Sequence, residues 1–592
     1  MRSARFAAVG VALLTVLGLG TVVATSAGAT RSQPPSGTLV SNGSPMTPFS
    51  QNKQNEPAVA IDANHPMVLA AGSNDEIDLG PCGTAGATAS RPCPFTAGVG
   101  TSGIYFSFNG GKSWIQPTYT GWSARTGTPQ VGPIGTLPGY FESGLVSDGD
   151  PALAFGPRPD SAGHFSWANG SRLYYANLTA NFSSKPNQAF RGAEAIAVSR
   201  TDDASAAARN DQSAWMAPVI ASKQSSTTFS DKEQVWADNA SSSPFFGTAY
   251  VCYAQFRSNS VHRQANAPAP LTVLVSHDGG SSWSSNQLVP ASTSPNNKNG
   301  QSAFGVSGCT VRTDSHGNAY AFGEQFSASS TLPAHNQHVM FKSTDGGRSW
   351  SKAIPVQQVT DACFFFDPVQ GRCEFDGVTG ARSDLAATPS VDIANGAPTG
   401  ASATNEIVDA WSDGRDGLNH EHTLVSTSTN GGANWSSPVI ASEGNDRPEY
   451  SAPAIAPDGS TVYLTYLGFT TPFQTTTSSP REMLGVFRQA TVGPSGAVGA
   501  FSTLERGAQG DARGSSANSL IAEFLGDYVY AAATPTYGVG VWTDSRNAAD
   551  CPAIDAYRQS LETSSPLPTP FPPTDCPGAF GNTDIFSATT AP

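Results

Sequence analysis

One short pattern recurs four times in this chain: SFNGGKSW (107–114), SHDGGSSW (276–283), STDGGRSW (343–350) and STNGGANW (428–435). Four copies in 592 residues indicate that one structural unit is repeated. The Asp or Asn at the third position can accept hydrogen bonds from backbone N–H groups two residues on, which closes a turn. The Gly-Gly pair tolerates positive φ, and the final Trp can fill the seam between packed sheets. The octet therefore predicts a hairpin turn between the third and fourth strands of a repeated β unit.

Alternating apolar segments flank the octets and arrive in a repeated order, as half-buried strands do. The predicted first strands are EPAVAID (56–62), DPALAFG (150–156), KEQVWAD (232–238), GCTVRTD (308–314), TPSVDIA (388–394), APAIAPD (452–458) and GDYVYAAA (526–533). The second strands are VLAAGSND (68–75), RLYYANL (172–178), AYVCYAQF (249–256), AYAFGEQF (319–326), EIVDAWSD (406–413), TVYLTYLGF (461–469) and VGVWTDSR (539–546). Repeated antiparallel units of this kind are typical of the blades of a β-propeller. We therefore expect an all-β chain with one propeller of four-stranded blades over 49–590, in which Asp584-Ile585-Phe586 adds a strand that closes the ring.

The octets resemble the Asp-box, S-x-D-x-G-x-[ST]-W, of sialidases and other Asp-box (BNR-repeat) propellers. The resemblance spans about 50–590, with departures at Asn109, Asn430 and Asn434. Seven repeats predict seven blades, and the six blades of sialidases are the alternative. The resemblance implies a protein that acts on glycans as a glycoside hydrolase. A non-catalytic propeller that binds glycan or protein is the other class of function.

The N-terminus predicts export. A basic head, Met1–Arg5, precedes an apolar run and the small residues Ala27-Gly28-Ala29, as in a secretory signal peptide over 1–29 that is cleaved near Ala29. A retained membrane anchor is the alternative, and no later segment approaches the length of a membrane span. We expect residues 30–48 to be a flexible segment and the mature protein to be extracellular, with a glycan or glycoconjugate as partner. A net charge of −14 gives no basic surface for nucleic acid.

Eight cysteines in an exported chain predict four disulfides. Their number permits 105 pairings, but three pairs are close in sequence and would each close a Pro/Gly-rich loop. The expected pairs are Cys82–Cys93, Cys363–Cys373, Cys551–Cys576 and, by remainder, Cys252–Cys309.

The starts of the first strands and the ends of the second strands open on the same face of a propeller, where ligands usually bind. Acidic residues gather at the first-strand starts: Glu56, Asp148, Asp150, Asp231, Glu233, Asp384, Glu449 and Asp527. Such residues are also ordinary at strand ends. A pair of these carboxylates could hydrolyse a neutral glycan.

The resemblance to sialidases implies a second set of site residues. Three arginines that hold a substrate carboxylate would be Arg257, Arg415 and Arg546. Tyr450 would be the nucleophile, Glu324 its base and Asp75 the acid. The first-blade arginine motif of sialidases is absent, because Gln54-Asn55-Glu56-Pro57 stands there. A carboxylate at that place would repel a sialic acid, so exo-sialidase activity is not established by the resemblance.

The sequence contains no motif that indicates another common class of enzyme. The sequence has no G-x-S-x-G, P-loop or dinucleotide-binding fingerprint. No cofactor is required by either expected function. The oxygen-rich loop Asp413-Gly414-Arg415-Asp416-Gly417 suggests a structural Ca²⁺, although it lacks the D-x-D-x-D-G spacing of a calcium loop.

Overall fold

A computed structural model describes residues 36–42, 53–182, 188–257, 270–289, 305–327, 332–376, 378–383, 385–515 and 525–592. The predicted signal peptide, 1–29, lies outside these residues. Within the described part of the chain, no helix is long and apolar enough to span a membrane.

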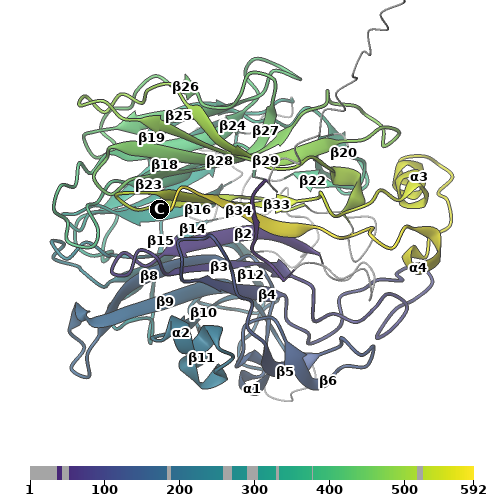
Figure 1. Cartoon of the computed structure of the whole chain (residues 1–592), viewed down its shortest axis with the longest axis horizontal. Helices are drawn as coiled ribbons and strands as arrows, with labels where there is room; N and C mark the ends of the chain where they lie inside the picture. Colours follow the sequence, from purple (N-terminus) through teal and green to yellow (C-terminus); the bar gives the residue numbers. More distant parts are fainter. Residues whose placement is uncertain are drawn as a thin grey trace, which may run out of the picture. The chain divides into compact units, whose positions relative to one another are not determined.

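Seven main antiparallel sheets follow one another along the chain, as the repeated strand pairs predict (Figure 1). The first sheet contains β2 (Gln54–Ile61), β3 (Leu69–Asp75) and β4 (Ser102–Ser107). The second contains β7 (Leu145–Ser147), β8 (Ala152–Pro159), β9 (Phe165–Asn181), β10 (Ala195–Thr201) and β11 (Trp215–Ile220). The third contains β12 (Thr228–Ala237), β13 (Ala249–Arg257), β14 (Leu271–Ser276) and β15 (Ser284–Gln287). The fourth contains β16 (Val306–Thr313), β17 (Ala319–Gln325), β18 (His335–Ser343) and β19 (Ile354–Thr360).

The remaining main sheets have the same strand order. The fifth contains β23 (Ser390–Ile393), β24 (Ile407–Asp413), β25 (His422–Ser428) and β26 (Val439–Ile440). The sixth contains β27 (Arg447–Ile455), β28 (Thr461–Phe469), β29 (Glu482–Thr491), β30 (Ser502–Arg506) and β31 (Gly510–Asp511). The seventh contains β32 (Tyr530–Ala533), β33 (Gly538–Asp544), β34 (Asp584–Thr589) and β1 (Thr38–Leu39). Two small sheets lie in connections: β5 (Tyr119–Ser123) with β6 (Gln130–Ile134), and β20 (Phe366–Asp367) with β21 (Arg372–Glu374) and β22 (Arg382–Ser383).

The first strands of the seven sheets contact one another in cyclic order. Strand β2 contacts β8, which contacts β12, and the series continues through β16, β23, β27 and β32. Strand β32 then contacts β2 again, so the order returns to its start. This arrangement of antiparallel sheets is consistent with the propeller expected from the sequence.

The last sheet is completed by both ends of the chain. Asp584–Thr589 forms β34, so the predicted closing strand is present, and β34 pairs with β33. On its other side it pairs with β1, with Thr38 opposite Ser587 and Leu39 opposite Phe586. The segment 30–48, expected to be flexible, therefore contributes a strand, because its short apolar stretch covers an otherwise open sheet edge.

The four octets form the predicted hairpin turns, with one difference in register. Asp278 accepts hydrogen bonds from the N–H groups of Ser281 and Ser282 at 3.0 and 2.9 Å, three and four residues on rather than two. The Ser276 hydroxyl donates to Asp278 and accepts from the N–H of Gly280. All eight octet glycines that form the Gly-Gly pairs have positive φ, between 67° and 87°. The Gly-Gly pair makes the turn, so the N–H groups that Asp278 binds come after it, three and four residues on.

Each octet indole packs in an apolar cluster formed by two neighbouring sheets. Trp283 packs between the second and third sheets, Trp350 between the third and fourth, and Trp435 between the fourth and fifth. Trp114 packs between the seventh and first sheets and donates to Ser587 Oγ at 3.0 Å. The predicted role of the Trp as a filler of the seam is therefore confirmed.

All four predicted disulfides are present: Cys82–Cys93, Cys252–Cys309, Cys363–Cys373 and Cys551–Cys576. Cys252 lies on β13 and Cys309 on β16, so this bond joins the third sheet to the fourth. The other three close connections between strands.

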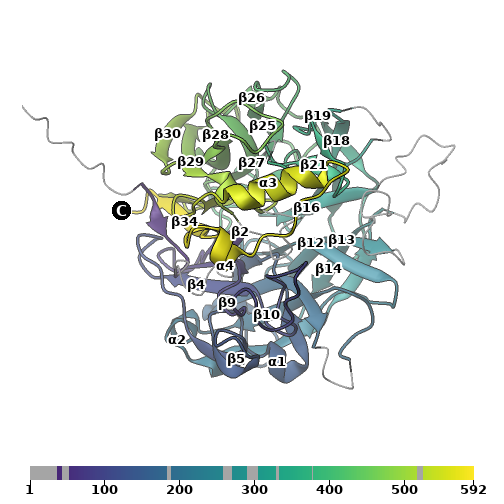
Figure 2. The same ribbon diagram turned by 90° about the vertical axis from the view of Figure 1, so that its right-hand side faces the viewer.

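The helices are short and lie in connections: α1 (Tyr140–Ser143), α2 (Ala204–Ala208), α3 (Pro552–Leu561), α4 (Pro572–Asp575) and the 3₁₀ turns η1 (Gln212–Ala214) and η3 (Ala512–Gly514). Helices α3 and α4 both lie in the insertion between β33 and β34 (Figure 2). Sequence reasoning did not predict α3, which begins directly after Cys551, where a Pro at the first turn favours a helix start.

Candidate functional site

The start of several first strands carries a β-bulge that holds charged residues in an unusual backbone conformation. The pairing register shifts between Asn55 and Ala58 and again between Asp231 and Gln234. Glu56, Asp150 and Lys232 have φ of 53°, 51° and 62°, a region that side-chain-bearing residues seldom adopt. Such strain persists only where the surrounding structure imposes it, and it is common at functional sites.

The bulges bring Lys232 among carboxylates from three sheets. Its Nζ lies 2.5 Å from Asp527 Oδ2, 3.3 Å from Asp150 Oδ2 and 3.7 Å from Asp231 Oδ1. The Lys232 side chain is only 9% exposed and that of Asp527 is fully buried. Burial alone would lower the pKa of Lys232, but the three carboxylates and Glu56 raise it, so the ammonium stays charged. We call Glu56, Asp150, Asp231, Lys232 and Asp527 the axial cluster.

The carboxyl groups of the axial cluster differ in the direction of their pKa shifts. Burial raises the pKa of Asp231 to about 7, against the influence of Lys232 and with a further contribution from Asp150. Burial also raises the pKa of Glu56, to which Asn74 Nδ2 and the N–H of Asp527 donate at 2.8 and 3.0 Å. The pKa of Asp150 is lowered, because Lys232 and the hydrogen bonds of Glu56 and Asp231 outweigh burial. The pKa values of neighbouring carboxyl groups are therefore shifted in opposite directions, as in acid–base catalytic sites.

A cavity of about 50 Å³ lies beside the axial cluster. Lys232, Glu233, Asp527, Tyr528 and Tyr450 all line it. Glu233 is 3% exposed, and neither of its carboxyl oxygens has a hydrogen-bond partner among the described residues. Burial and the charge of Asp150 raise the pKa of Glu233, which favours its protonated form. Asp527 lies 2.5 Å from the Lys232 ammonium.

Tyr450, the expected nucleophile, lies on β27 and is 2% exposed. Its ring stacks on Phe375, and its hydroxyl donates to Ser383 Oγ at 3.3 Å. Ser383 in turn donates to Glu449 Oε1 at 2.5 Å. Burial raises the pKa of Glu449 to about 8. Among the described residues, Ser383 therefore connects Tyr450 to the carboxyl group of Glu449, and sequence reasoning did not single out this serine.

Glu324 and Asp75, the expected base and acid, are buried and not among the residues that line the cavity with Tyr450. Glu324 accepts from Asn336 Nδ2 at 2.6 Å, and burial raises its pKa to about 8. Asp75 accepts four hydrogen bonds of 2.7 to 3.0 Å, from Gln54, Ile77, Tyr105 and Gln116.

The expected substrate-binding arginines Arg415 and Arg546 are bound by their own loops. Arg415 donates from Nε and Nη2 to the two oxygens of Asp413, both at 2.7 Å. Arg546 does the same to Asp544, at 2.8 and 2.6 Å. In both loops a Trp two residues before the Asp also donates to it: Trp411 to Asp413, and Trp542 to Asp544. The side chain of Arg257 lies outside the described part of the structure.

Sequence reasoning found most of the acidic groups of this region but not Lys232. The signal for it was available, since Lys232 follows Asp231 at the position where the first two repeats have Glu56 and Asp150. A cation at that place, between acids from neighbouring repeats, would have indicated a buried ion-pair cluster.

The described residues contain no group of three or more His, Cys, Asp or Glu that could hold a metal ion. In the loop suggested for Ca²⁺, the Asp413 oxygens accept from Trp411 and Arg415. A structural Ca²⁺ stays a prediction, which a change of melting temperature on addition of EDTA would support.

The chain was compared with known proteins. No protein-family model and no curated protein matches it. It is similar to a solved structure of a protein of unknown function from Dyadobacter fermentans, at 13% identity over 68% of this chain and 95% of that chain, with a TM-score of 0.37. It is also similar to the Hadza microbial sialidase Hz136, at 12% identity over 70% and 63% of the two chains, with a TM-score of 0.37. A third similar structure is the NanB sialidase from Streptococcus pneumoniae, at 10% identity over 74% of this chain and 68% of that chain, with a TM-score of 0.37. Sialidases are thus among the structures to which this chain is similar.

Proposed function

We propose that this chain is an exported, seven-bladed β-propeller with Asp-box hairpins that acts on extracellular glycans as a glycoside hydrolase. The cyclic contacts of the seven first strands support the blade count. The four disulfides fit an oxidising compartment outside the cytosol.

One observation carries the proposed activity: two carboxyl groups in different surroundings, Glu233 without a polar partner and Asp527 beside an ammonium, line the same cavity. Glycoside hydrolysis needs an acid that protonates the leaving oxygen and a carboxylate that either activates water or attacks the sugar. Glu233 is suited to the first role because burial raises its pKa. Asp527 is suited to the second because the Lys232 ammonium lies 2.5 Å from it, and an opposite charge at this distance favours a carboxylate. Asp150 and Asp231 also lie within ion-pair distance of Lys232.

The charge of the site favours a neutral or cationic glycan over an acidic one. The axial cluster contains four carboxyl groups and one ammonium. Arg415 and Arg546, which would hold a substrate carboxylate in a sialidase, already bind Asp413 and Asp544. An amino sugar or a neutral hexose would not meet this repulsion.

The test is hydrolysis of a panel of aryl glycosides by the full chain. Glu233→Gln and Asp527→Asn should each lower kcat by at least about 100-fold, the usual contribution of one acid or base. Asp345→Asn is the matched control, since it removes a carboxylate from an octet turn in which other copies carry Asn. Unchanged kcat in both site variants would reject the assignment.

The same panel separates the alternatives. A fluorogenic sialoside that is hydrolysed by the protein but not by Tyr450→Phe or Glu324→Gln would support the sialidase-type site instead. Retention on a glycan array without release of any aglycone would support the non-catalytic binding propeller.

A further inference from the structure

The β-bulge at the start of the first strand recurs in four of the sheets. The two residues at the register shift are Glu56-Pro57 in β2, Lys232-Glu233 in β12, Gly308-Cys309 in β16 and Glu449-Tyr450 in β27. The bulges of β12, β16 and β27 all contribute to the wall of the cavity beside the axial cluster. Cys309 thus occupies, in the fourth sheet, the position that Glu233 and Tyr450 occupy in the third and sixth.

The bulge of β12 holds Lys232 in a conformation that is unfavourable for a residue with a side chain. Its φ is 62°, and such a conformation persists only where the surrounding structure fixes it. The position of the bulge matters, because the Lys232 ammonium has to reach carboxylates from the second and seventh sheets. Contacts from outside β12 are therefore expected to hold this bulge.

The Cys252–Cys309 disulfide supplies such a contact between the bulges of β12 and β16. Cys309 belongs to the β16 bulge, and its Sγ lies 3.7 Å from the carbonyl oxygen of Lys232. Cys252 lies on β13 opposite Gln234, the first paired residue after the β12 bulge. Both cysteines are buried, with exposed fractions of 0% and 4%. The disulfide therefore contacts the Lys232 bulge and is bonded to the strand that pairs with it.

The bulge of β16 is itself fixed by the segment that leads into β23. Gly308 has a φ of 62°, and a Cβ at this position would lie 2.2 Å from Thr388 Cγ2, so a larger residue fits only if the chain moves. The Thr310 hydroxyl donates to the carbonyl oxygen of Pro389 at 3.0 Å. Because the β16 bulge is held in this way, the disulfide connects the Lys232 bulge to a fixed point.

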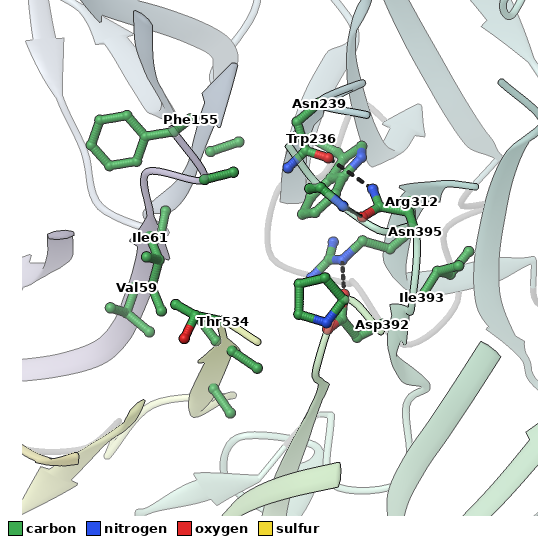
Figure 3. Close-up of a pocket in the computed structure, with 18 of the residues that line it drawn as sticks. Val59, Ile61, Phe155, Trp236, Asn239, Arg312, Asp392, Ile393, Asn395 and Thr534 are labelled. Carbon is green, nitrogen blue, oxygen red and sulfur yellow. Dashed lines mark hydrogen bonds and ion pairs between the residues drawn. The ribbon is translucent and has the colours of Figure 1, made fainter. Parts of the chain in front are cut away.

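The third, fourth and fifth sheets are also joined at the other end of their first strands (Figure 3). The Arg312 guanidinium lies 4.7 Å from the centroid of the Trp236 ring and donates from Nε to Asp392 Oδ1 at 3.3 Å. Trp236 Nε1 donates to Thr313 Oγ1 at 2.9 Å. Trp236 lines a separate cavity of about 100 Å³ and is not among the described residues around the axial cluster's cavity. Its contacts offer a control, because they join the same two sheets away from Lys232.

We propose that the Cys252–Cys309 disulfide is a positioning element of the axial cluster, which keeps the Lys232 ammonium within reach of its carboxyl partners. Without the bond, the β12 bulge is free to move relative to β16. The Nζ atom then loses the distances of 2.5 to 3.7 Å that it has to three carboxyl oxygens. The proposal concerns the geometry of the cluster and does not require hydrolysis. Its consequence for kcat rests on the proposed function.

A double-mutant cycle on the full chain tests the positioning role. Melting temperatures are measured for the wild type, for Lys232→Met, for Cys252→Ser with Cys309→Ser, and for the variant with all three changes. Effects of residues that do not interact normally add. If the disulfide positions Lys232, its ion pairs are already weakened when the bond is absent. Lys232→Met should then lower the melting temperature by less than half as much as it does in the wild type.

Trp236→Phe is the matched control, since it removes the hydrogen bond to Thr313 at the other end of the strands and leaves the disulfide intact. In the Trp236→Phe background, Lys232→Met should lower the melting temperature by its full amount. Additive losses in the disulfide cycle would overturn the proposal, and so would an equal departure from additivity with Trp236→Phe.

A kinetic measurement separates this proposal from the proposed function. If the wild type hydrolyses an aryl glycoside and Glu233→Gln does not, the disulfide variant should lose at least tenfold in kcat with KM unchanged, because a misplacement of about 1 Å is costly at a catalytic site. The measurement is made where circular dichroism shows the variant to be folded, and an unchanged kcat would count against positioning. If the wild type hydrolyses nothing, the proposed function fails and the cycle alone decides this proposal.

A second variant covers the case in which the disulfide variant does not fold. Gly308→Ala keeps the disulfide but displaces the bulge that carries Cys309, because its Cβ meets Thr388. It should reduce the effect of Lys232→Met on the melting temperature in the same way. A full effect of Lys232→Met in this background would overturn the proposal.

Discussion

The Nδ1 atom of His338 lies 2.8 Å from Asp409 Oδ2, and this contact joins the fourth sheet to the fifth in a region where both side chains are fully buried. The other ring nitrogen, Nε2, lies 2.7 Å from the carbonyl oxygen of Ala387. A carbonyl oxygen can only accept a hydrogen bond, and so can a carboxylate. When Asp409 is ionised, both ring nitrogens face acceptors, an arrangement that favours the imidazolium form of His338.

This pair predicts a pH dependence of stability. Burial would lower the pKa of His338, but the charge and hydrogen bond of Asp409 and the Ala387 carbonyl raise it. A raised folded-state pKa gives stability that is fully present below the unfolded value of about 6.5 and lost as the pH rises through the folded value. His338→Gln should therefore lower the melting temperature more at pH 6 than at pH 9. Equal losses at both pH values, measured by calorimetry, would contradict the imidazolium.

Loss of Lys232 should destabilise the protein strongly at neutral pH. Removing one partner of a buried ion pair typically costs about 3–5 kcal/mol, because the other charge is left without compensation. Lys232→Met leaves Asp150, Asp231 and Asp527 without their ammonium, so it should melt well below the wild type at pH 7. At acidic pH the difference in melting temperature between Lys232→Met and the wild type should be smaller, because the carboxylates are then neutral. The double variant Lys232→Met, Asp527→Asn is the control, and it should recover part of the loss.

The structure of the octet turns predicts that replacing Asp345 by Asn and replacing it by Ala will have different effects on stability. Asp345 accepts from the N–H and hydroxyl of Ser349, and these bonds lower its pKa to about 2. Asp345→Ala should lower the free energy of unfolding by about 1 kcal/mol, the usual value for a side chain that satisfies free backbone N–H groups. Asp345→Asn should cost much less, because Asn430 makes the equivalent bond to the N–H of Asn434. Chemical denaturation of the three proteins decides this, and equal losses in the two variants would refute the capping role.

The disulfide between the third and fourth sheets should stabilise the folded protein more than a disulfide between cysteines that are close in sequence. Cys252 and Cys309 are separated by 57 residues, and Cys82 and Cys93 by 11. The chain-entropy model gives about 4 kcal/mol for the first and about 3 kcal/mol for the second. Replacing both cysteines by serine in each pair, followed by thermal melting, should show the larger loss for Cys252–Cys309. A larger loss for the local pair would mean that packing, rather than chain entropy, dominates.

The sequence predicted those parts of the fold that local patterns determine. The octet turns, the strand pairs and the disulfides follow from spacing alone, because the interacting residues are near one another or have few partners to choose from. The bulges at Glu56, Asp150 and Lys232 could not be predicted in this way, since they depend on neighbouring sheets that hold the backbone at positive φ.

In the candidate site, too, the sequence predicts only what local patterns determine. Acids at the strand starts are visible in the sequence, but the raised pKa of Glu233 depends on its burial among other sheets. For the two arginines, in contrast, the local sequence does contain the signal that explains their contacts. Arg415 and Arg546 each follow an Asp by two residues, and this local spacing explains why they bind Asp413 and Asp544. The pattern D-x-R at a strand end indicates an internal ion pair before it indicates a substrate contact.

The pairing of β1 with β34 has a consequence for how the chain is made. Thr38–Leu39 is synthesised more than 500 residues before its partner, Asp584–Thr589. Strand β1 therefore has no partner until residues 584–589 have been synthesised, and the seventh sheet can be completed only then. Deletion of Thr38–Leu39 should leave one edge of β34 unpaired.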